Sequence, residues 1–174
     1  NIFGMNVDAD TFAAASAEAH LPTDAAQFFF TPTLVNTGAE LVLFDTGLSA
    51  AGTLAAVTAA GYTADQVDVV VITHMHGDHI GGMMNEGSAT YPNARYVTGQ
   101  KEYDAWAKAG NENFDNNMRP MAEQTTFLDA GPDVVTGITS VAAFGHTPGH
   151  MTYRLTPEGK SMLLGAEFAT HVVW

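Results

Sequence analysis

Four side chains able to bind a metal lie close together in the middle of the chain, where residues 73–79 read Thr-His-Met-His-Gly-Asp-His. This run follows residues 67–73, a nearly unbroken series of β-branched apolar residues that predicts a strand buried on both faces. In an extended loop, alternate side chains point the same way, so His74 and His76 are expected to converge on one metal. Asp78 and His79 would then face a neighbouring point. The spacing predicts two adjacent metal sites.

A second histidine cluster reads Gly-His-Thr-Pro-Gly-His at residues 145–150. It follows the apolar run 138–144, so here too histidines come directly after an expected strand. This cluster can supply the third ligand that the first metal needs. The chain has no Cys, so any metal must be held by His, Asp or Glu. Imidazole and carboxylate ligands suit Zn²⁺, Fe or Mn, and zinc is the default expectation.

The elements that must position these clusters alternate between helix and strand, which predicts an α/β layer protein. Short β runs at 33–36 and 40–45 are joined by a Thr-Gly hairpin signal. Further expected elements are helices at 10–21, capped by Asp10, at 53–60 and at 100–109, a strand at 94–98, and several short strands between 126 and 164.

Composition excludes several partners. The 174 residues include 6 Lys+Arg and 19 Asp+Glu, a formal net charge of −13, which disfavours nucleic acid and anionic membrane surfaces. The longest uncharged stretch, residues 46–64, is interrupted by glycines, so no membrane-spanning segment is expected. The lack of Cys leaves the compartment open, with an exported or periplasmic location slightly favoured over a cytoplasmic one.

The two histidine motifs, THMHGDH and GHTPGH, resemble those of the metallo-β-lactamase superfamily of αββα metallohydrolases. From Leu34 onward the chain is most similar to the branch that contains methyl parathion hydrolase and lactonase-like enzymes. The supporting segments are LVNTGAELVLFDTGL, AAGYTADQVDVVVITHMHGDHIGGM and YPNARYVTGQKEYDAW. The resemblance implies one αββα domain over residues 1–174.

Carried over by motif, the resemblance implies the following metal ligands: His74, His76 and His146 for one metal, and Asp78 and His79 for the second. Asp45 corresponds to a carboxylate that orients a ligand histidine; its alternative role is to cap the turn after a strand. His150 would support the site without binding metal.

Two departures from the family pattern stand out. Where the family places a metal-bridging Asp, this chain reads Leu-Gly-Ala-Glu at residues 164–167. Glu167 is the favoured bridge; in the other alignment Ala166 takes the position and the bridge is lost, with His171 either recruited or only packed nearby. The family also uses a later histidine on a C-terminal strand, so we expect a fragment that lacks the C-terminal strand and helix region. Exposed sheet surface would then favour a homodimer or another partner.

The expected activity is metal-dependent hydrolysis. A metal lowers the pKa of bound water from about 15.7 to about 7, and Asp78 would accept and return the proton. With two zinc ions the substrate would be an ester, lactone, phosphotriester or β-lactam. The chain has only 6 Lys+Arg, none near His146, so a neutral, apolar ester, lactone or organophosphate suits this acidic protein better than a β-lactam with its carboxylate. Acylhomoserine lactonases of the superfamily often have a tyrosine where this chain has Thr170 or Ala169, which disfavours that particular lactonase arrangement. The alternatives are a mononuclear iron dioxygenase and a catalytically impaired binding module.

Overall fold

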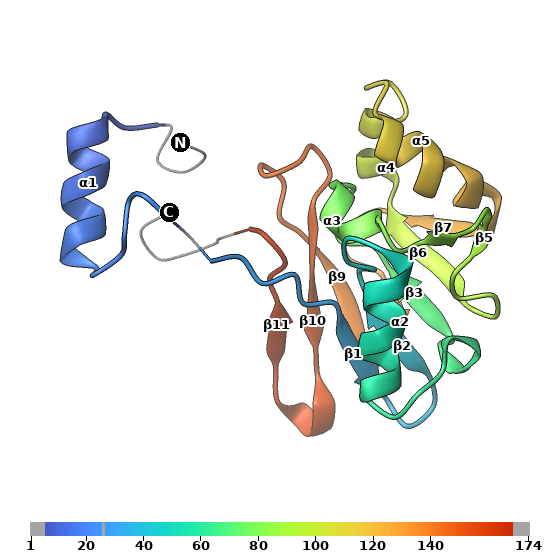
Figure 1. Ribbon diagram of the computed structural model, residues 1–174. Coiled ribbons are helices and arrows are strands. Elements are labelled where there is room, and N and C mark those ends of the chain that lie inside the picture. Colours follow the sequence, from blue (N-terminus) through green and yellow to red (C-terminus); the bar gives the residue numbers. More distant parts are fainter. Residues whose placement is uncertain (1–5, 26, 169–174) are drawn as a thin grey trace. The chain divides into compact units, whose positions relative to one another are not determined.

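The computed structural model describes residues 6–25 and 27–168. The chain forms two units, one made of residues 1–29 and 169–174 and the other of residues 30–168. The first unit contains helix α1, Ala9–Glu18 (Figure 1). Its N-cap is Asp8, whose carboxylate accepts a hydrogen bond from the Thr11 amide at 2.8 Å. The expected cap at Asp10 is therefore wrong: Asp10 lies in the first turn, where a carboxylate also suits the helix dipole.

The second unit is built on a five-stranded sheet with the order β1-β2-β3-β6-β7. Its strands are β1 Thr33–Asn36, β2 Leu41–Phe44, β3 Val69–Val71, β6 Arg95–Gly99 and β7 Thr125–Leu128. The predicted β1–β2 hairpin is confirmed as an antiparallel pair, whereas β2, β3, β6 and β7 run parallel. All three residues of β3 are buried, as the apolar run predicts.

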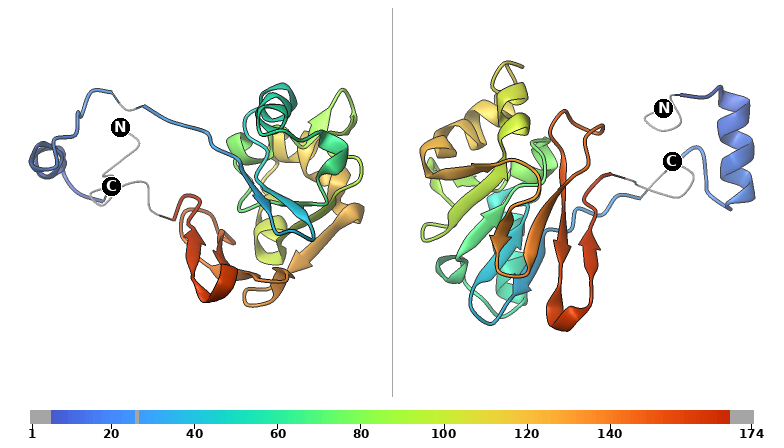
Figure 2. Two further views of the ribbon diagram at one scale, coloured as in Figure 1. Left: turned by 90° about the horizontal axis from the view of Figure 1, so that it is seen from below. Right: turned by 180° about the vertical axis from the view of Figure 1, so that it is seen from behind.

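A second, antiparallel sheet has the order β11-β10-β9-β8. Its strands are β8 Asp133–Val135, β9 Ile138–Ala142, β10 Met151–Leu155 and β11 Met162–Leu164. In Figure 2 these orange to red strands lie on the opposite side of the first sheet from the helices of residues 30–168. A two-stranded ribbon, β4 Met84–Asn85 and β5 Ser88–Ala89, completes the strands of the described residues.

The helices of this unit are α2 Ala50–Ala59, α3 Gly77–Ile80, α4 Gln100–Trp106 and α5 Glu112–Asn117. Short 3₁₀ turns occupy Ala64–Gln66, Arg119–Gln124 and Pro157–Gly159. The sequence predicts α2 and α4 within a few residues at their ends, but α3 and α5 were not expected. None of the helices in the described ranges is long and apolar enough to cross a membrane.

Two cores lie on the two faces of the five-stranded sheet, and β3 contributes to both because its side chains alternate. Val70 packs with Val57 of α2 and Phe114 of α5. Val69 and Val71 pack with the second sheet. Residues 30–168 thus form three layers, helices on sheet on sheet, which agrees with the αββα fold class without a second helical layer in this unit. The single-domain boundary at 1–174 stays a prediction.

The turn after β2 packs tightly against the end of α3, and glycine makes this possible. A Cβ atom on Gly82 would lie 2.2 Å from the Thr46 carbonyl oxygen, and one on Gly81 would lie 2.4 Å from that of Leu48. Real Cβ atoms do not approach backbone oxygen so closely, so these two positions accept no side chain without movement. The Thr46 amide in turn donates to the His79 carbonyl at 2.7 Å. The two glycines therefore allow the turn that carries Asp45 to pack against α3, which carries His79.

We expect Gly82→Ala to lower the free energy of unfolding by about 1–3 kcal/mol, because the added methyl group forces two backbone segments apart. Gly52→Ala is the matched control. Gly52 lies on the exposed face of α2 and a Cβ there would meet only the Ser49 hydroxyl at 3.4 Å, so alanine should stabilise the protein by about 0.5–1 kcal/mol. Urea denaturation followed by circular dichroism measures both. Equal stabilities of the two variants would contradict the packing argument.

Candidate metal centre

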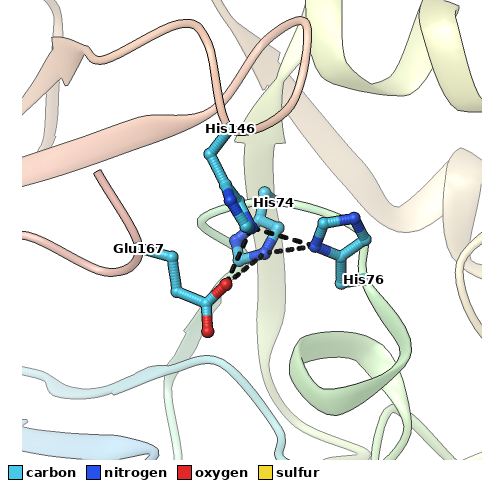
Figure 3. A group of neighbouring side chains, drawn as sticks. All are labelled: His74, His76, His146 and Glu167. Atoms are coloured by element: carbon cyan, nitrogen blue, oxygen red, sulfur yellow. Dashed lines mark hydrogen bonds and ion pairs between the residues drawn. The ribbon is translucent and has the colours of Figure 1, made fainter. Parts of the chain in front are cut away.

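Three imidazoles and one carboxylate converge from three separate parts of the second unit (Figure 3). His74 lies in the loop after β3 and His76 directly precedes α3, while His146 comes from the β9–β10 connection and Glu167 follows β11. The His76 Nδ1 atom lies 3.1 Å from His74 Nε2 and 3.0 Å from His146 Nε2. Glu167 Oε2 lies 2.7 Å from His146 Nε2. All four donor atoms lie within 4.8 Å of one another.

These separations fit a tetrahedral transition-metal ion. Zinc–nitrogen bonds of about 2.0–2.1 Å at tetrahedral angles place two ligand nitrogens roughly 3.3 Å apart. The observed nitrogen pairs at 3.0 and 3.1 Å are close to this value and need only a small outward adjustment. The residues therefore fit a metal of the zinc type.

A second group of donors is formed by Asp78, His79 and Glu167. The His79 Nε2 atom lies 3.4 Å from Asp78 Oδ2 and 3.8 Å from Glu167 Oε1. Glu167 thus presents Oε2 to the first group and Oε1 to the second. One carboxylate facing two donor groups through its two oxygens has the arrangement of a bridge between neighbouring cations.

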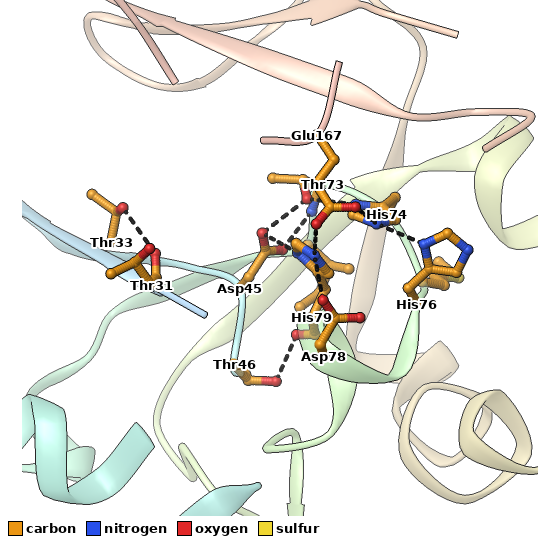
Figure 4. Close-up of polar contacts among 12 residues, drawn as sticks. Thr31, Thr33, Asp45, Thr46, Thr73, His74, His76, Asp78, His79 and Glu167 are labelled. Carbon is orange, nitrogen blue, oxygen red and sulfur yellow. Dashed lines mark hydrogen bonds and ion pairs between the residues drawn. The ribbon is translucent and has the colours of Figure 1, made fainter. Parts of the chain in front are cut away.

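The buried Asp45 carboxylate connects to one histidine of each group (Figure 4). Its Oδ2 accepts a hydrogen bond from His79 Nδ1 at 2.8 Å and one from the Thr73 hydroxyl at 2.8 Å. A hydroxyl has one hydrogen, so Thr73 Oγ1 must act as acceptor toward His74 Nδ1, 3.1 Å away. In His74, Nδ1 carries the hydrogen and the Nε2 lone pair is left for a metal. In His79, Nδ1 donates to Asp45, so Nε2 is the atom that faces Asp78 and Glu167.

The surroundings keep two histidines of the first group, His74 and His76, neutral. Burial, followed by the neighbouring histidines, lowers the pKa of His74 and of His76 below the ordinary value of 6.5. Neutral imidazole is the form that binds metal. Hydrogen bonding to His79 is the largest effect that lowers the pKa of Asp78 and of Glu167, so both carboxyls are ionised and able to bind a cation.

His79 behaves in the opposite way. Burial disfavours its charged form, but the hydrogen bonds to Asp45, Asp78 and Glu167 outweigh burial and raise the pKa of His79 far above 6.5. Without a cation, His79 is therefore an imidazolium surrounded by carboxylates. A cation bound by the second group replaces this proton with another positive charge.

The six residues predicted as ligands all lie in these two groups: His74, His76, Asp78, His79, His146 and Glu167. One detail of the local geometry is wrong. Asp78 and His79 do not follow an extended loop but lie in the first turn of α3, and the helical turn brings His79 against Asp45. Ala166 is exposed and points no donor at the site, which supports Glu167 as the residue in the bridging position.

His150 belongs to neither group of donors. Its Nε2 accepts a hydrogen bond from the Glu167 amide at 3.2 Å, so it supports the backbone that carries the carboxylate. His171, the other histidine considered for this region, lies outside the described residues. Sequence reasoning missed Thr73, whose only signal is its place immediately before the first histidine of the motif.

The family model described as the metallo-beta-lactamase superfamily matches residues 31–166. Among solved structures, the hydrolase AbOPH of the beta-lactamase superfamily aligns with a TM-score of 0.79 and 25% identity, over 90% of this chain and 62% of that chain. AidC, a dizinc quorum-quenching lactonase with a bound homoserine product, aligns with a TM-score of 0.75 and 20% identity over the same shares. A probable metal-dependent hydrolase from Staphylococcus aureus has a TM-score of 0.69 and 23% identity, over 79% of this chain and 57% of that chain.

No curated protein matches the chain. The chain spans 62% of the length of the first two structures. The identities of 20% to AidC and 23% to the Staphylococcus aureus protein show a shared fold only. The family match, however, extends over most of the chain and includes both histidine motifs. By its sequence, its layered fold and the place of its clustered histidines, the chain belongs to the metallo-beta-lactamase superfamily.

Proposed function

We propose that this chain carries the active site of a hydrolase that uses two metal ions, with zinc as the expected metal. The observation that carries the proposal is the position of Glu167, which faces two groups of donors through its two oxygens. The 25% identity to a hydrolase of the same superfamily supports it. Placement in the methyl parathion hydrolase and lactonase-like branch is part of the proposal, as is a homodimer.

Bound metal ions supply an activated water and polarise the carbonyl or phosphoryl oxygen of the substrate. The chain supplies the proton acceptor. The Asp78 carboxylate is ionised, lies 3.4 Å from His79 Nε2 and is partly exposed, so solvent reaches it. We assign to Asp78 the role of accepting the proton from the nucleophile and returning it to the leaving group.

The surface beside the donor groups favours a substrate with an apolar part. Leu48, Phe144 and Phe168 are about half exposed or more, and each lies within three residues of Asp45, His146 or Glu167 in the chain. The Trp106 ring stands edge-on to the His76 imidazole, with centroids 5.4 Å apart. Exposed apolar side chains on the segments that carry polar site residues are typical of a binding site.

One basic side chain contacts the segment that carries His146. The Lys101 ammonium lies 3.8 Å from the centroid of the Phe144 ring, two residues before His146. The sequence does not reveal this contact, because Lys101 lies in α4, far from Phe144 along the chain. A carboxylate on the substrate therefore has one candidate cation, and a β-lactam belongs among the compounds to be tested.

Two other functions are distinguished by metal content. A mononuclear iron dioxygenase would need one ion, whereas the donors here divide into two groups that share Glu167. A binding module without catalysis would need no ionised proton acceptor such as Asp78. The two groups therefore favour a hydrolase with two ions.

The test loads the purified chain with Zn²⁺, Mn²⁺ or Fe²⁺, measures bound metal, and follows hydrolysis of an aryl ester, an N-acyl homoserine lactone, an aryl phosphotriester and a chromogenic β-lactam. We expect two metal equivalents and turnover of a neutral ester, lactone or phosphotriester, with both lost in His74→Ala and His76→Ala. One iron with oxygen consumption on a persulfide would establish the dioxygenase. Two bound ions with no turnover of any compound would favour the binding module.

Glu167→Gln should lower the affinity for the second ion by more than about 100-fold, beyond the 10- to 100-fold typical of residues that only support a ligand. The amide cannot offer two anionic oxygens. Glu158→Gln, an exposed position in the turn before β11, is the control and should bind both ions normally. Metal titration with a chromogenic chelator measures the stepwise affinities. Ala166→Asp should bring no gain; a gain would instead support the other alignment.

Metal binding should release protons unequally at the two sites. His74 and His76 are neutral at pH 7, whereas His79 is protonated, so the second ion displaces about one proton from His79 and the first displaces none from His74 or His76. Because the raised pKa favours the proton, affinity for the second ion should rise with pH above neutrality. Calorimetry in buffers of different ionisation enthalpy counts the protons. Equal release in both steps would contradict the assignment.

A further inference from the structure

A fully buried carboxylate, Glu102 of α4, lies beside the metal centre but belongs to neither group of donors. Burial of a carboxylate is costly unless the charge is compensated by hydrogen bonds. Among the described residues, Glu102 has no cationic side chain within ion-pair distance, so hydrogen-bond donors must supply the compensation.

Four donors surround this carboxylate. Oε1 accepts from the Met75 amide at 3.1 Å and from the Trp106 indole at 2.7 Å. Oε2 accepts from the Thr147 hydroxyl at 2.8 Å and from the Gly149 amide at 2.7 Å. A carboxylate has about four lone-pair sites, so all of them are used.

Each donor belongs to a part of the metal centre. Met75 lies between His74 and His76, and Thr147 follows His146 directly. Trp106 stands edge-on to the His76 ring. One buried side chain therefore connects the two loops that carry the three histidines of the first group, together with the aromatic residue beside them.

The contact is also enforced by backbone packing. A Cβ atom on Gly149 would lie 2.2 Å from the Glu102 amide nitrogen, so the loop of residues 145–150 rests directly on the first turn of α4. Only glycine allows this approach. The position of Glu102 relative to the loop is thus set by the main chain as well as by the hydrogen bonds.

We propose that Glu102 is a positioning residue that sets the separation between His76 and His146, and through it the affinity of the first donor group for its metal. The inference rests on the proposed function of the site. Charge-assisted hydrogen bonds to Met75 and Thr147 hold the two loops at the spacing that gives 3.0 Å between His76 Nδ1 and His146 Nε2. Loss of these bonds lets the loops separate without removing any ligand.

The test is Glu102→Gln, which keeps the size of the side chain but turns an amide NH₂ group toward two of the donors. Affinity for the first Zn²⁺ should fall about 10- to 100-fold. The visible spectrum of the Co²⁺-loaded protein should change, because it reports ligand geometry. The exposed Glu123→Gln is the control and should match the parent chain in both measurements.

Thr147→Val keeps the test decisive if Glu102→Gln does not fold. It removes one donor and leaves the carboxylate, so the first Zn²⁺ should bind several-fold more weakly with the Co²⁺ spectrum shifted in the same direction. Unchanged metal affinity and spectrum in Thr147→Val, or in a folded Glu102→Gln, would overturn the inference. If the parent chain itself binds no metal, the proposed function fails instead.

Discussion

The Asp45 carboxylate is the interaction on which the rest of the metal centre depends. It accepts hydrogen bonds from the Thr73 amide and hydroxyl and from His79, which together join the end of β2 to the loop after β3 and to α3. Through these bonds it orients His79 directly and sets the tautomer of His74 through Thr73. The backbone of Asp45 is in the left-handed region, with φ of +59°, which is the conformation that turns the chain at the end of β2. The carboxylate thus acts on both groups without belonging to either.

The parallel arrangement of β2, β3 and β6 explains why these groups meet. Carboxyl ends of parallel strands lie at the same edge of a sheet, where ligand sites of α/β folds are found. Asp45 follows β2, the first histidine motif follows β3, and Glu102 follows β6 within α4. Each of the three strands therefore brings different side chains to one edge of the sheet: Asp45, the candidate metal ligands of the first histidine motif, and Glu102.

The second sheet completes the centre from the other side. His146 comes from the β9–β10 connection and Glu167 follows β11, so two of the four donors of the first group depend on the packing of the sheets. The Met151 amide, at the start of β10, donates to the Thr73 carbonyl at 3.1 Å and joins the two sheets beside the histidines. Apolar packing of Val69, Val71 and Tyr153 holds the layers together beneath this contact. The metal centre is accordingly a feature of the interface between layers.

The sequence by itself determined the parts that depend on local pattern. The apolar run before Thr73 predicted the buried strand, because both of its faces are covered, and the Thr-Gly turn predicted the β1–β2 hairpin. Residue types and spacing indicated the histidines and Asp78 as metal ligands, since few other functions need so many donors in so short a stretch.

Only the tertiary structure decided the contacts between distant segments. It brings Glu167 rather than Ala166 to the donors, folds Asp78 and His79 into α3, and places Lys101 over Phe144. The same is true of Glu102, which in the sequence is one of 19 acidic residues and shows no sign of burial. The physical reason is that local periodicity reports which face of an element is apolar, whereas a hydrogen bond or a shared ligand depends on which loops the packed layers bring together.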